Sequence, residues 1–505
     1  MIEASQAWKD IQNSFLLPET YVEIDCTISA VGAEKGATVR GDYEAKFSNV
    51  ASTITDAYNP VGYATNELNL WSLNGTKTIL PSSAPYDSMG YVSDIASTGG
   101  VTLSFPATHY VTSSGLTITW SNVYGEYPAI FTVTAKQGDT VIAEQTTVDN
   151  RTQTSVVFLD IIDCDSITIT VHDWGLPYRR VRIEKIIIGH VLTLTKNDII
   201  SFKHEQHGDL LSGGMPKSSI EFTLNNIDGR WNPNNPTGME RYLSERQKLV
   251  VRYGMVVNGS VEWIKGGVFW LSEWDAPSNG YEARFVARDS LEFMMGQEVR
   301  DNVSGTLTNL VRAVAPVDVA VVVDSSLSNY SSTYTPEPEK YLYASELVQM
   351  ISNAGLSIMR YDRDGVLNIE PLRTIPSGYT ITSALSYTHP EVILAKPLRS
   401  ISVEYGAETP FELSVSNVGE TQTVSNPLVV DQTRASQIAE WVREVLTARK
   451  TVSGEFRADP RLDLFDVVVV ESKYGRLEPV VITNITYTYN GSFRGSYTGR
   501  ILEGI

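Results

Sequence analysis

His204-Glu205-Gln206-His207 is the first group whose residue types could do chemistry, because imidazole nitrogens and carboxylate oxygens bind metal ions. The two histidines are not at the spacing of a His-Glu-X-X-His helix motif, and the flanking residues favour a strand and a loop. Asp209 would have to complete any ligand set. We therefore interpret the group as solvated polar residues before a turn at Gly208, and we predict no metal site.

A second acidic group, Asp362-Arg363-Asp364-Gly365, resembles part of a calcium loop because it places two carboxylates close together. The later bidentate glutamate of such a loop is missing. The pair Asp364-Gly365 is instead typical of a tight turn. We predict a hairpin here, with strands over Leu356–Tyr361 and Val366–Pro371.

Signatures of covalent catalysis and nucleotide binding are absent from the sequence. It has no Gly-X-Ser-X-Gly elbow, no phosphate-binding Gly-X-X-X-X-Gly-Lys-Ser/Thr and no Gly-X-Gly-X-X-Gly between a strand and a helix. Cys26 and Cys164 are too few for a disulfide framework or a thiolate metal site. We predict no catalytic residue and no cofactor. A glycosidase carboxylate pair stays open as an alternative, because the separation that defines it is spatial.

The most promising candidate site is a concentration of aromatic residues between about 60 and 190. Sugars present flat C–H faces that stack on aromatic rings, while their hydroxyls need polar partners. The alternative is that these side chains fill a core or pack against neighbouring domains. The glycan-binding candidates are Trp120, Tyr124, Tyr127, Trp174, Tyr178 and Arg179.

The elements that must position these residues are mostly strands, because polar and apolar residues alternate in short stretches bounded by Gly, Asn, Asp and Pro. In the aromatic region the spacing predicts a β-sandwich or jelly roll. The strands expected there are Gly100–Phe105, Gly115–Trp120, Ala129–Lys136, Thr140–Thr147, Thr154–Leu159, Ser166–His172 and Arg180–Ile188. The chain is therefore predicted to be mainly β.

Helices are predicted at Leu307–Val314, at Ala344–Ala354 before Gly355, and at Ser436–Arg449. The last of these has one apolar face, and we interpret it as a helix that covers a β-barrel. Its apolar face is Ile438, Trp441, Val442, Val445 and Leu446, and its polar face is Glu440, Arg443 and Glu444.

Length and charge limit the classes of function. A chain of 505 residues predicts about three or four domains. Forty Lys plus Arg against fifty-nine Asp plus Glu give a net charge of −19, which excludes a basic footprint for nucleic acid or an anionic membrane. No apolar run approaches the ~20 residues of a membrane helix, and no secretory signal is recognisable, so we expect a soluble protein made in the cytoplasm.

Several stretches occur in an order that resembles the baseplate hub proteins of tailed phages, prophages and phage-like particles. They are Leu211–Pro233, Leu243–Gly254, Tyr361–Pro371, Phe456–Val468 and Glu471–Gly475. This resemblance covers about residues 190–505. It implies two β-barrel domains per subunit, assembled as a trimer whose pseudo-sixfold ring matches a hexameric tail tube. A tube that conducts DNA should not hold it, and the acidic balance permits like-charged lumen walls.

Residues 60–190 separately resemble a galactose-binding-like jelly roll of the carbohydrate-binding kind, with Asp165–Val171 and Arg180–Ile186 as its closing strands. We interpret this module as an insertion into the first barrel. The expected domains are 1–58 (first strands of the first hub barrel), 59–190 (jelly roll), 191–300 (rest of the first barrel), 301–395 (small α/β domain) and 396–505 (second hub barrel with helix 436–449).

The resemblance implies a non-enzymatic, homotrimeric tail hub that joins the tail tube to the tip or spike, located in the virion and assembled in the host cytoplasm. The implied partners are tail tube or distal tail proteins, a central spike or tip protein and a tape-measure protein. A host cell-surface glycan is a further candidate partner for the jelly roll. The alternatives are a free-standing carbohydrate-binding adhesion protein and a glycan hydrolase.

Overall fold

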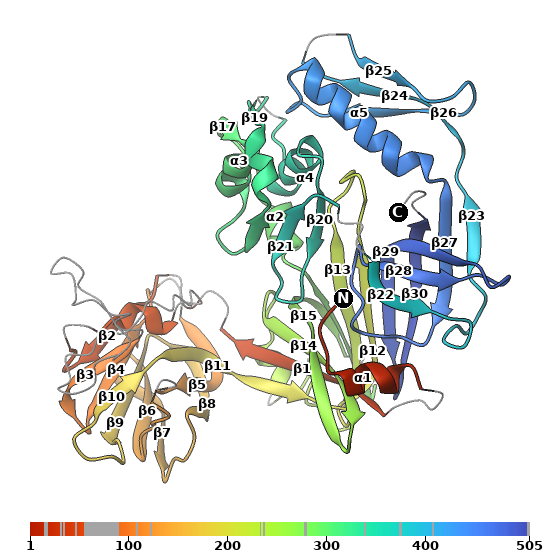
Figure 1. Cartoon of the computed structure of the whole chain (residues 1–505). Coiled ribbons are helices and arrows are strands. Elements are labelled where there is room, and N and C mark those ends of the chain that lie inside the picture. The colour runs from red at the N-terminus through yellow and green to blue at the C-terminus, as the bar shows by residue number, and fades with distance from the viewer. Residues whose placement is uncertain are drawn as a thin grey trace, which may run out of the picture. The chain divides into compact units, whose positions relative to one another are not determined.

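The computed structural model is mainly β, as predicted (Figure 1). It describes residues 1–14, 19–30, 33, 36–45, 48–54, 90–107, 110–121, 124–232, 234–235, 238–276, 280–337, 340–372, 376–406 and 409–501. Residues 59–89, the first part of the predicted jelly roll, lie outside this description. Among the described residues, no helix is both long and apolar enough to cross a lipid bilayer.

The chain divides into two units. The larger unit contains Met1–Asp25, Thr193–Asn232 and Lys248–Ile505, and the smaller unit contains Cys26–Leu192 and Pro233–Gln247. The smaller unit is thus formed mainly by one long excursion of the chain. In the larger unit, the Thr193 hydroxyl donates to the Asp25 carboxylate (2.6 Å), so the chain leaves and re-enters that unit at adjacent points.

The larger unit contains two sheets at the places predicted for barrels, which we call the first and second barrel sheets. The domain boundary expected at 395 is wrong, because Pro376–Ile381 and Glu391–Leu394 belong to the second barrel sheet, while Leu398–Glu404, Phe411–Ser414 and Glu420–Ser425 form a separate sheet. The first barrel sheet has the strand order β12-β13-β16-β15-β14-β1. Its strands are β1 (Thr20–Ser29), β12 (Ile199–His207), β13 (Lys217–Asn225), β14 (Lys248–Val257), β15 (Ser260–Asp275) and β16 (Glu282–Arg288). Alternate side chains of β13 are buried, as expected of a strand with one face in a core. The core of this sheet includes Trp231, which packs on Phe285 with ring centroids 5.3 Å apart.

The second barrel sheet has the order β23-β27-β30-β29, and β28 and β22 continue from β29. Its strands are β22 (Pro376–Ile381), β23 (Glu391–Leu394), β27 (Lys450–Phe456), β28 (Val467–Glu471), β29 (Leu477–Tyr489) and β30 (Phe493–Ile501). The short helix α1 (Gln6–Gln12) reaches this sheet, because the Gln12 amide donates to the Ala458 carbonyl (2.8 Å). The two barrel sheets are continuous, since β12 pairs with β29 from Phe202 opposite Tyr489 to His207 opposite Asn484.

The remaining elements of the larger unit share one core. In this group β21 pairs parallel to β18 and antiparallel to β20. The elements are α2 (Leu291–Met295), β17 (Val303–Thr306), α3 (Leu307–Val314), β18 (Val321–Val323), a 3₁₀ helix (Ser325–Asn329), β19 (Ser331–Tyr334), α4 (Ala344–Ala354), β20 (Ile358–Tyr361), β21 (Leu367–Glu370), β24 (Leu398–Glu404), β25 (Phe411–Ser414), β26 (Glu420–Ser425) and α5 (Gln432–Thr447).

Helix α5 begins earlier than predicted and packs against a different sheet. It begins at Gln432, because the Asp431 side chain accepts a hydrogen bond from the Arg434 backbone N–H (2.8 Å) and caps the helix. Ile438, Val442 and Val445 are buried as predicted, but the face they form packs on β24 and β25 and joins the core of α3 and α4. The helix therefore covers the sheet β25-β24-β26 and not a barrel (Figure 1). Periodicity identifies an apolar face, but not the sheet that it meets.

The smaller unit is a β-sandwich, one of the two architectures predicted for this region. The sheets β2-β4-β9-β6-β7 and β11-β5-β8 enclose one core, and β3 pairs with β10. The elements are β2 (Thr38–Asp42), a 3₁₀ helix (Val50–Ile54), β3 (Tyr91–Ala96), β4 (Gly99–Ser104), β5 (Val111–Thr119), β6 (Ile130–Gln137), β7 (Thr140–Val148), β8 (Thr154–Cys164), β9 (Ser166–Asp173), β10 (Arg180–Ile183), β11 (Lys185–Leu194) and a 3₁₀ helix (Met239–Tyr242). Strand β2 was expected in the first barrel, yet it pairs with β4.

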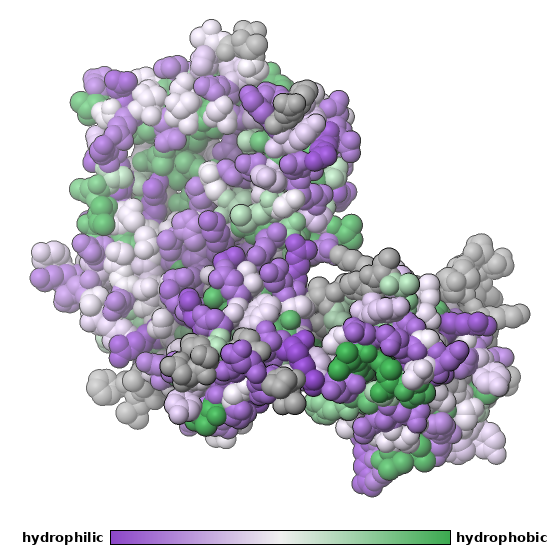
Figure 2. All heavy atoms as spheres, turned by 180° about the vertical axis from the view of Figure 1, so that it is seen from behind, coloured by the Kyte–Doolittle hydropathy of each residue, from purple (hydrophilic) through white to green (hydrophobic). Residues whose placement is uncertain are grey.

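Two surface features of the smaller unit follow from this arrangement. The segment Pro233–Gln247 is held on the sandwich by Tyr242 and Arg241, which contact the Asp160 carboxylate at 2.7 Å and 3.2 Å. The view in Figure 2 also shows an apolar patch on this unit. Exposed apolar side chains of β7 and β8 are Val141, Val148, Val156, Phe158 and Ile162.

Candidate functional site

The hairpin turn between β20 and β21 places one arginine in the interior of the larger unit. The turn forms as predicted: the Gly365 backbone N–H donates to the Asp362 carbonyl (3.0 Å), and Gly365 has φ +78°. A side chain there would be strained, and its Cβ would lie 3.1 Å from Val268. Arg363, at the tip of this turn, is buried.

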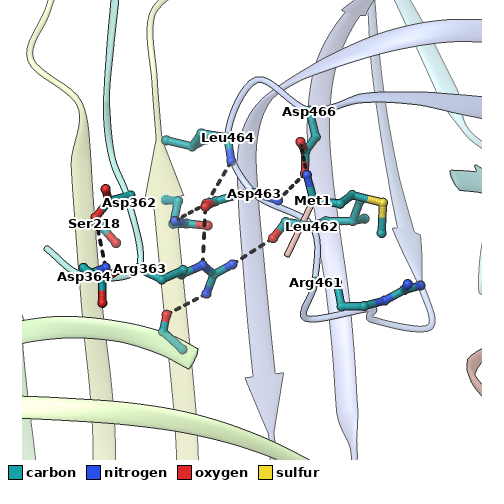
Figure 3. A network of polar contacts seen from close by, with 12 residues as sticks. Met1, Ser218, Asp362, Arg363, Asp364, Arg461, Leu462, Asp463, Leu464 and Asp466 are labelled. Carbon is teal, nitrogen blue, oxygen red and sulfur yellow. Dashed lines mark hydrogen bonds and ion pairs between the residues drawn. The ribbon is translucent and has the colours of Figure 1, made fainter. Parts of the chain in front are cut away.

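Arg363 connects the hairpin to both barrel sheets (Figure 3). Its guanidinium donates to the Gly266 carbonyl of β15 (2.6 Å) and to the Leu462 carbonyl of the loop before β28 (2.8 Å). It also forms an ion pair with Asp463 (3.4 Å), and the Gln206 amide of β12 donates to the same carboxylate (2.8 Å). We call Arg363, Asp463 and Gln206 the seam network, because they lie where the two barrel sheets join.

The charge of Arg363 is retained in the interior. Burial alone would lower the pKa of the guanidinium, but Asp463 and the hydroxyls of Tyr253 and Tyr487 raise its pKa above the usual value. A buried ion pair costs desolvation energy, and its partners depend on each other once it has formed. The seam network therefore fixes the positions of three segments of the larger unit.

His204 lies beside this network and corrects our interpretation of the His204–His207 group. Its ring nitrogens contact the Tyr253 hydroxyl (2.7 Å) and the Ser218 hydroxyl (3.0 Å), and the side chain is fully buried, not solvated. Burial and the nearby Arg363 charge lower its pKa well below the usual value, so the ring is neutral. Because alternate residues of a strand face opposite sides, His207 is exposed and contacts Asn484 instead (2.8 Å). The described residues contain no cluster of metal-ligating side chains.

Asp289 is a second buried ionisable group in the larger unit. Its carboxylate accepts hydrogen bonds from the backbone N–H groups of Ser218 and Leu291, the latter at 3.0 Å. Burial raises its pKa to about 7, although the two backbone donors oppose this shift. Ser218 thus connects His204, through its hydroxyl, to Asp289, through its backbone.

Two of the six glycan-binding candidates are core residues. Trp120 and Trp174 are fully buried and pack edge to face with ring centroids 6.2 Å apart. Their indole N–H groups are satisfied internally, by Ser155 (2.7 Å) and Glu126 (3.0 Å). Neither ring presents a face to a sugar, so these two predictions are corrected. A large aromatic residue in a sandwich buries more apolar area in the core than at the surface.

The other four candidates lie nearer the surface. Tyr178 is 93% exposed, and Arg179 forms an ion pair with Glu126 (3.3 Å). The Arg179 and Arg182 guanidinium carbons lie 6.0 Å and 4.8 Å from the Tyr124 ring centre. Tyr127 is half-buried and packs against the core. Tyr124, Tyr178 and Arg179 therefore remain the candidate glycan contacts.

Several residues of these sites carry no clear signal in the sequence. Nothing in a turn motif indicates that Arg363 points inward. The alternation of Phe202, His204 and Gln206 along β12 was a usable signal, since these three share the buried face. Asp289 directly follows β16, but its burial depends on the distant residue Ser218.

Known proteins resemble this chain in structure and not in sequence. No protein-family model matches the chain, and no curated protein matches it significantly. Solved structures do match. The chain is similar to phage tail proteins.

One such structure is the 43 kDa tail protein of prophage MuSo2 from Shewanella oneidensis, with 12% identity and a TM-score of 0.45 over 61% of this chain and 94% of that chain. Another is the prophage tail protein gp18 of Listeria monocytogenes, with 11% identity and a TM-score of 0.40 over 61% and 91%. A third is the Escherichia coli c3393 protein, a component of the type VI secretion system, with 13% identity and a TM-score of 0.34 over 61% and 74%.

Proposed function

We propose that this protein is a structural tail hub: three copies form a ring that adapts the hexameric tail tube to the tip or spike. The observation that carries the proposal is the pairing of β12 with β29, which makes the two barrel sheets one continuous sheet. The seam network fixes the same junction from inside. Each subunit then presents two sheets in a constant relation, and three subunits supply six positions for a sixfold tube.

The open end of this sheet supports assembly. β23 is the terminal strand of the second barrel sheet, and its only pairing among the described strands is with β27. Its consecutive side chains Val392, Ile393 and Leu394 are between 47% and 63% exposed. Exposed apolar edge strands are usually avoided, because they pair with other chains. A second copy of this chain is the occupant that the proposed ring provides.

In this proposal the protein is a non-enzymatic virion component, assembled in the host cytoplasm with tail tube or distal tail proteins, a tape-measure protein and a central spike or tip protein. The smaller unit is an appendage, and a host cell-surface glycan is its ligand. Tyr178 supports the glycan role, because a fully solvated tyrosine beside an arginine suits a sugar face with its hydroxyls.

The solution mass of the full chain tests the hub. Light scattering should give about three times the chain mass of 55.8 kDa, with rings in negative-stain images of the same peak. A monomer that neither self-assembles nor binds tail tube protein would contradict the proposal.

The rival functions have their own tests. A free-standing adhesion protein would bind wall polysaccharide as a monomer, and a glycan hydrolase would release sugar and lose that activity on one carboxylate change. On a glycan array, Tyr178→Ala should weaken binding by the full chain, while Tyr474→Ala, an equally exposed tyrosine of the larger unit, should not.

A further inference from the structure

A ring of three copies needs two different contact surfaces on each chain. Subunits related by a threefold axis meet head to tail, so one surface of a subunit contacts a second surface of its neighbour. The free edge of β23 supplies one surface, but it cannot pair with β23 of the neighbour, because that contact has twofold symmetry and closes at a dimer. The second surface must therefore lie elsewhere on the chain, and the proposed function does not assign it.

The second surface should be another strand with a free edge, because the backbone N–H and C=O groups along β23 need partners of the same kind. The side chains of β23 set two further requirements, since Val392, Ile393 and Leu394 are between 47% and 63% exposed. The receiving strand should carry no charge, because an unpaired charge in an apolar contact is costly. It should also expose an apolar side chain, because side chains of paired strands contact each other.

Most terminal strands of the described sheets fail these requirements. Charged residues occur in β2, β3, β7, β8, β10, β20, β25 and β26, namely Arg40, Asp94, Glu144, Asp160, Arg180, Arg360, Glu412 and Glu420. Strand β22 is uncharged, but its large side chains Tyr379 and Ile381 are buried. Strands β17 and β19 consist mainly of small polar residues and glycine.

Strand β18, which contains only Val321, Val322 and Val323, meets every requirement. It is a terminal strand of the sheet β18-β21-β20, and its only pairing among the described strands is the parallel one with β21. Alternate residues of a strand face opposite sides, so Val321 and Val323 pack against the core while Val322 is 57% exposed. The edge is three residues long, against four in β23. Both edges belong to the larger unit.

We propose that β23 of one copy adds to the free edge of β18 in the next copy, and that three such contacts close the ring. The added strand extends the sheet β18-β21-β20 by one strand and satisfies the backbone groups of both edges. Glu391, the charged residue of β23, lies at the end of that strand and not at its centre. This inference rests on the proposed hub function, but the hub does not require this particular contact.

Cysteine cross-linking between full-length chains tests this contact. Chains carrying Val322→Cys are co-expressed with chains carrying either Ile393→Cys or Leu394→Cys, and the purified protein is mildly oxidised. The natural cysteines Cys26 and Cys164 are buried, so the introduced thiols are the accessible ones. Opposed side chains of paired strands bring their Cβ atoms about as close as a disulfide needs. Adjacent residues of β23 face opposite sides, so we expect one of its two variants to form a covalent pair of chains.

Val418→Cys is the matched control for Val322→Cys, because Val418 is a 64% exposed valine of the larger unit in the turn before β26. It should give no more covalent pairs than the natural chain. Light scattering on the same samples reports the ring separately. A ring without a cross-link to Val322→Cys would overturn the contact and leave the hub in place, whereas a monomer would overturn both. Covalent pairs formed by a β23 variant alone would show a twofold contact and overturn the inference.

A charge at the same position gives a second measurement that does not depend on oxidation. Val322→Lys should shift the solution mass from the ring toward the monomer, because it places an unpaired ammonium in the apolar contact. Val418→Lys should leave the mass unchanged. Both sites are exposed, so neither change removes a buried contact. An intact ring in Val322→Lys would exclude β18 from the interface.

Discussion

Arg363 is a single side chain on which three segments of the larger unit depend. Replacing it with methionine leaves the Asp463 carboxylate buried with only the Gln206 amide as its partner side chain. We expect Arg363→Met to lower the free energy of unfolding by about 3–5 kcal/mol, as measured by urea denaturation. Arg300→Met, at an exposed ion pair, should change it by less than about 1 kcal/mol. Equal effects would show that the seam network adds no stability.

Asp289 predicts a pH dependence of stability. The pKa of this carboxyl is raised from 3.8 to about 7 by burial, so folding favours its protonated form. The stability gained from Asp289 is complete below pH 3.8, declines as the pH rises, and is lost above about pH 7. The backbone donors of Ser218 and Leu291 and the charge of Lys217 lower the pKa of Asp289, whereas the charge of Glu292 raises it. The Tyr361 side chain interacts electrostatically with the same carboxyl.

The variant Asp289→Asn isolates this effect, because other titrating groups cancel in the comparison. From about pH 5 to about pH 8, we expect the free energy of unfolding of the natural protein to fall by roughly 2–3 kcal/mol relative to the variant. Denaturant unfolding at each pH measures the difference. A difference that stays constant over this range would contradict the raised pKa.

At the scale of elements, the sequence predicted strand positions better than strand partners. Seven predicted strands of the smaller unit cover the eight strands β4–β11, with the predicted strand Arg180–Ile188 divided between β10 and β11. Strand positions are predictable because alternation reports directly which faces are buried. Residues 1–58 were assigned to the first barrel, but Thr38–Asp42 within that range pairs with β4 of the smaller unit, and the apolar face of α5 was wrongly assigned to a barrel. Partners are set by contacts far apart in the chain, for which a local pattern carries no signal. For the same reason, the sequence did not show that Trp120 lies in the core whereas Tyr178 lies on the surface.

The exposed edge of strand β23 is the expected contact between copies of the chain. If a second copy pairs along this edge, a charge at its centre should weaken assembly, because an unpaired lysine in an apolar contact is costly. We expect Ile393→Lys to shift the solution mass from the ring toward the monomer. Ile227→Lys, at a more exposed isoleucine in the loop after β13, should leave the mass unchanged. Loss of the ring in both variants, or in neither, would remove β23 from the interface.

For the whole molecule, the close approach of Asp25 and Thr193 indicates that residues 26–192 of the smaller unit can be replaced by a short connection, which keeps Thr20–Asp25 of β1 in the first barrel sheet. The larger unit has its own cores and keeps the β12–β29 junction. We therefore expect a chain in which residues 26–192 are replaced by a short Gly/Ser linker to fold and to form the same ring as the full chain.

The same variant separates assembly from recognition, because the remaining glycan candidates Tyr124, Tyr178 and Arg179 are all deleted. It should lose binding on the glycan array while light scattering still gives three times its own mass. A deleted chain that folds but stays monomeric would place the assembly contacts in the smaller unit. The smaller units would then hold the ring together, and the continuous sheet would have no role in forming it.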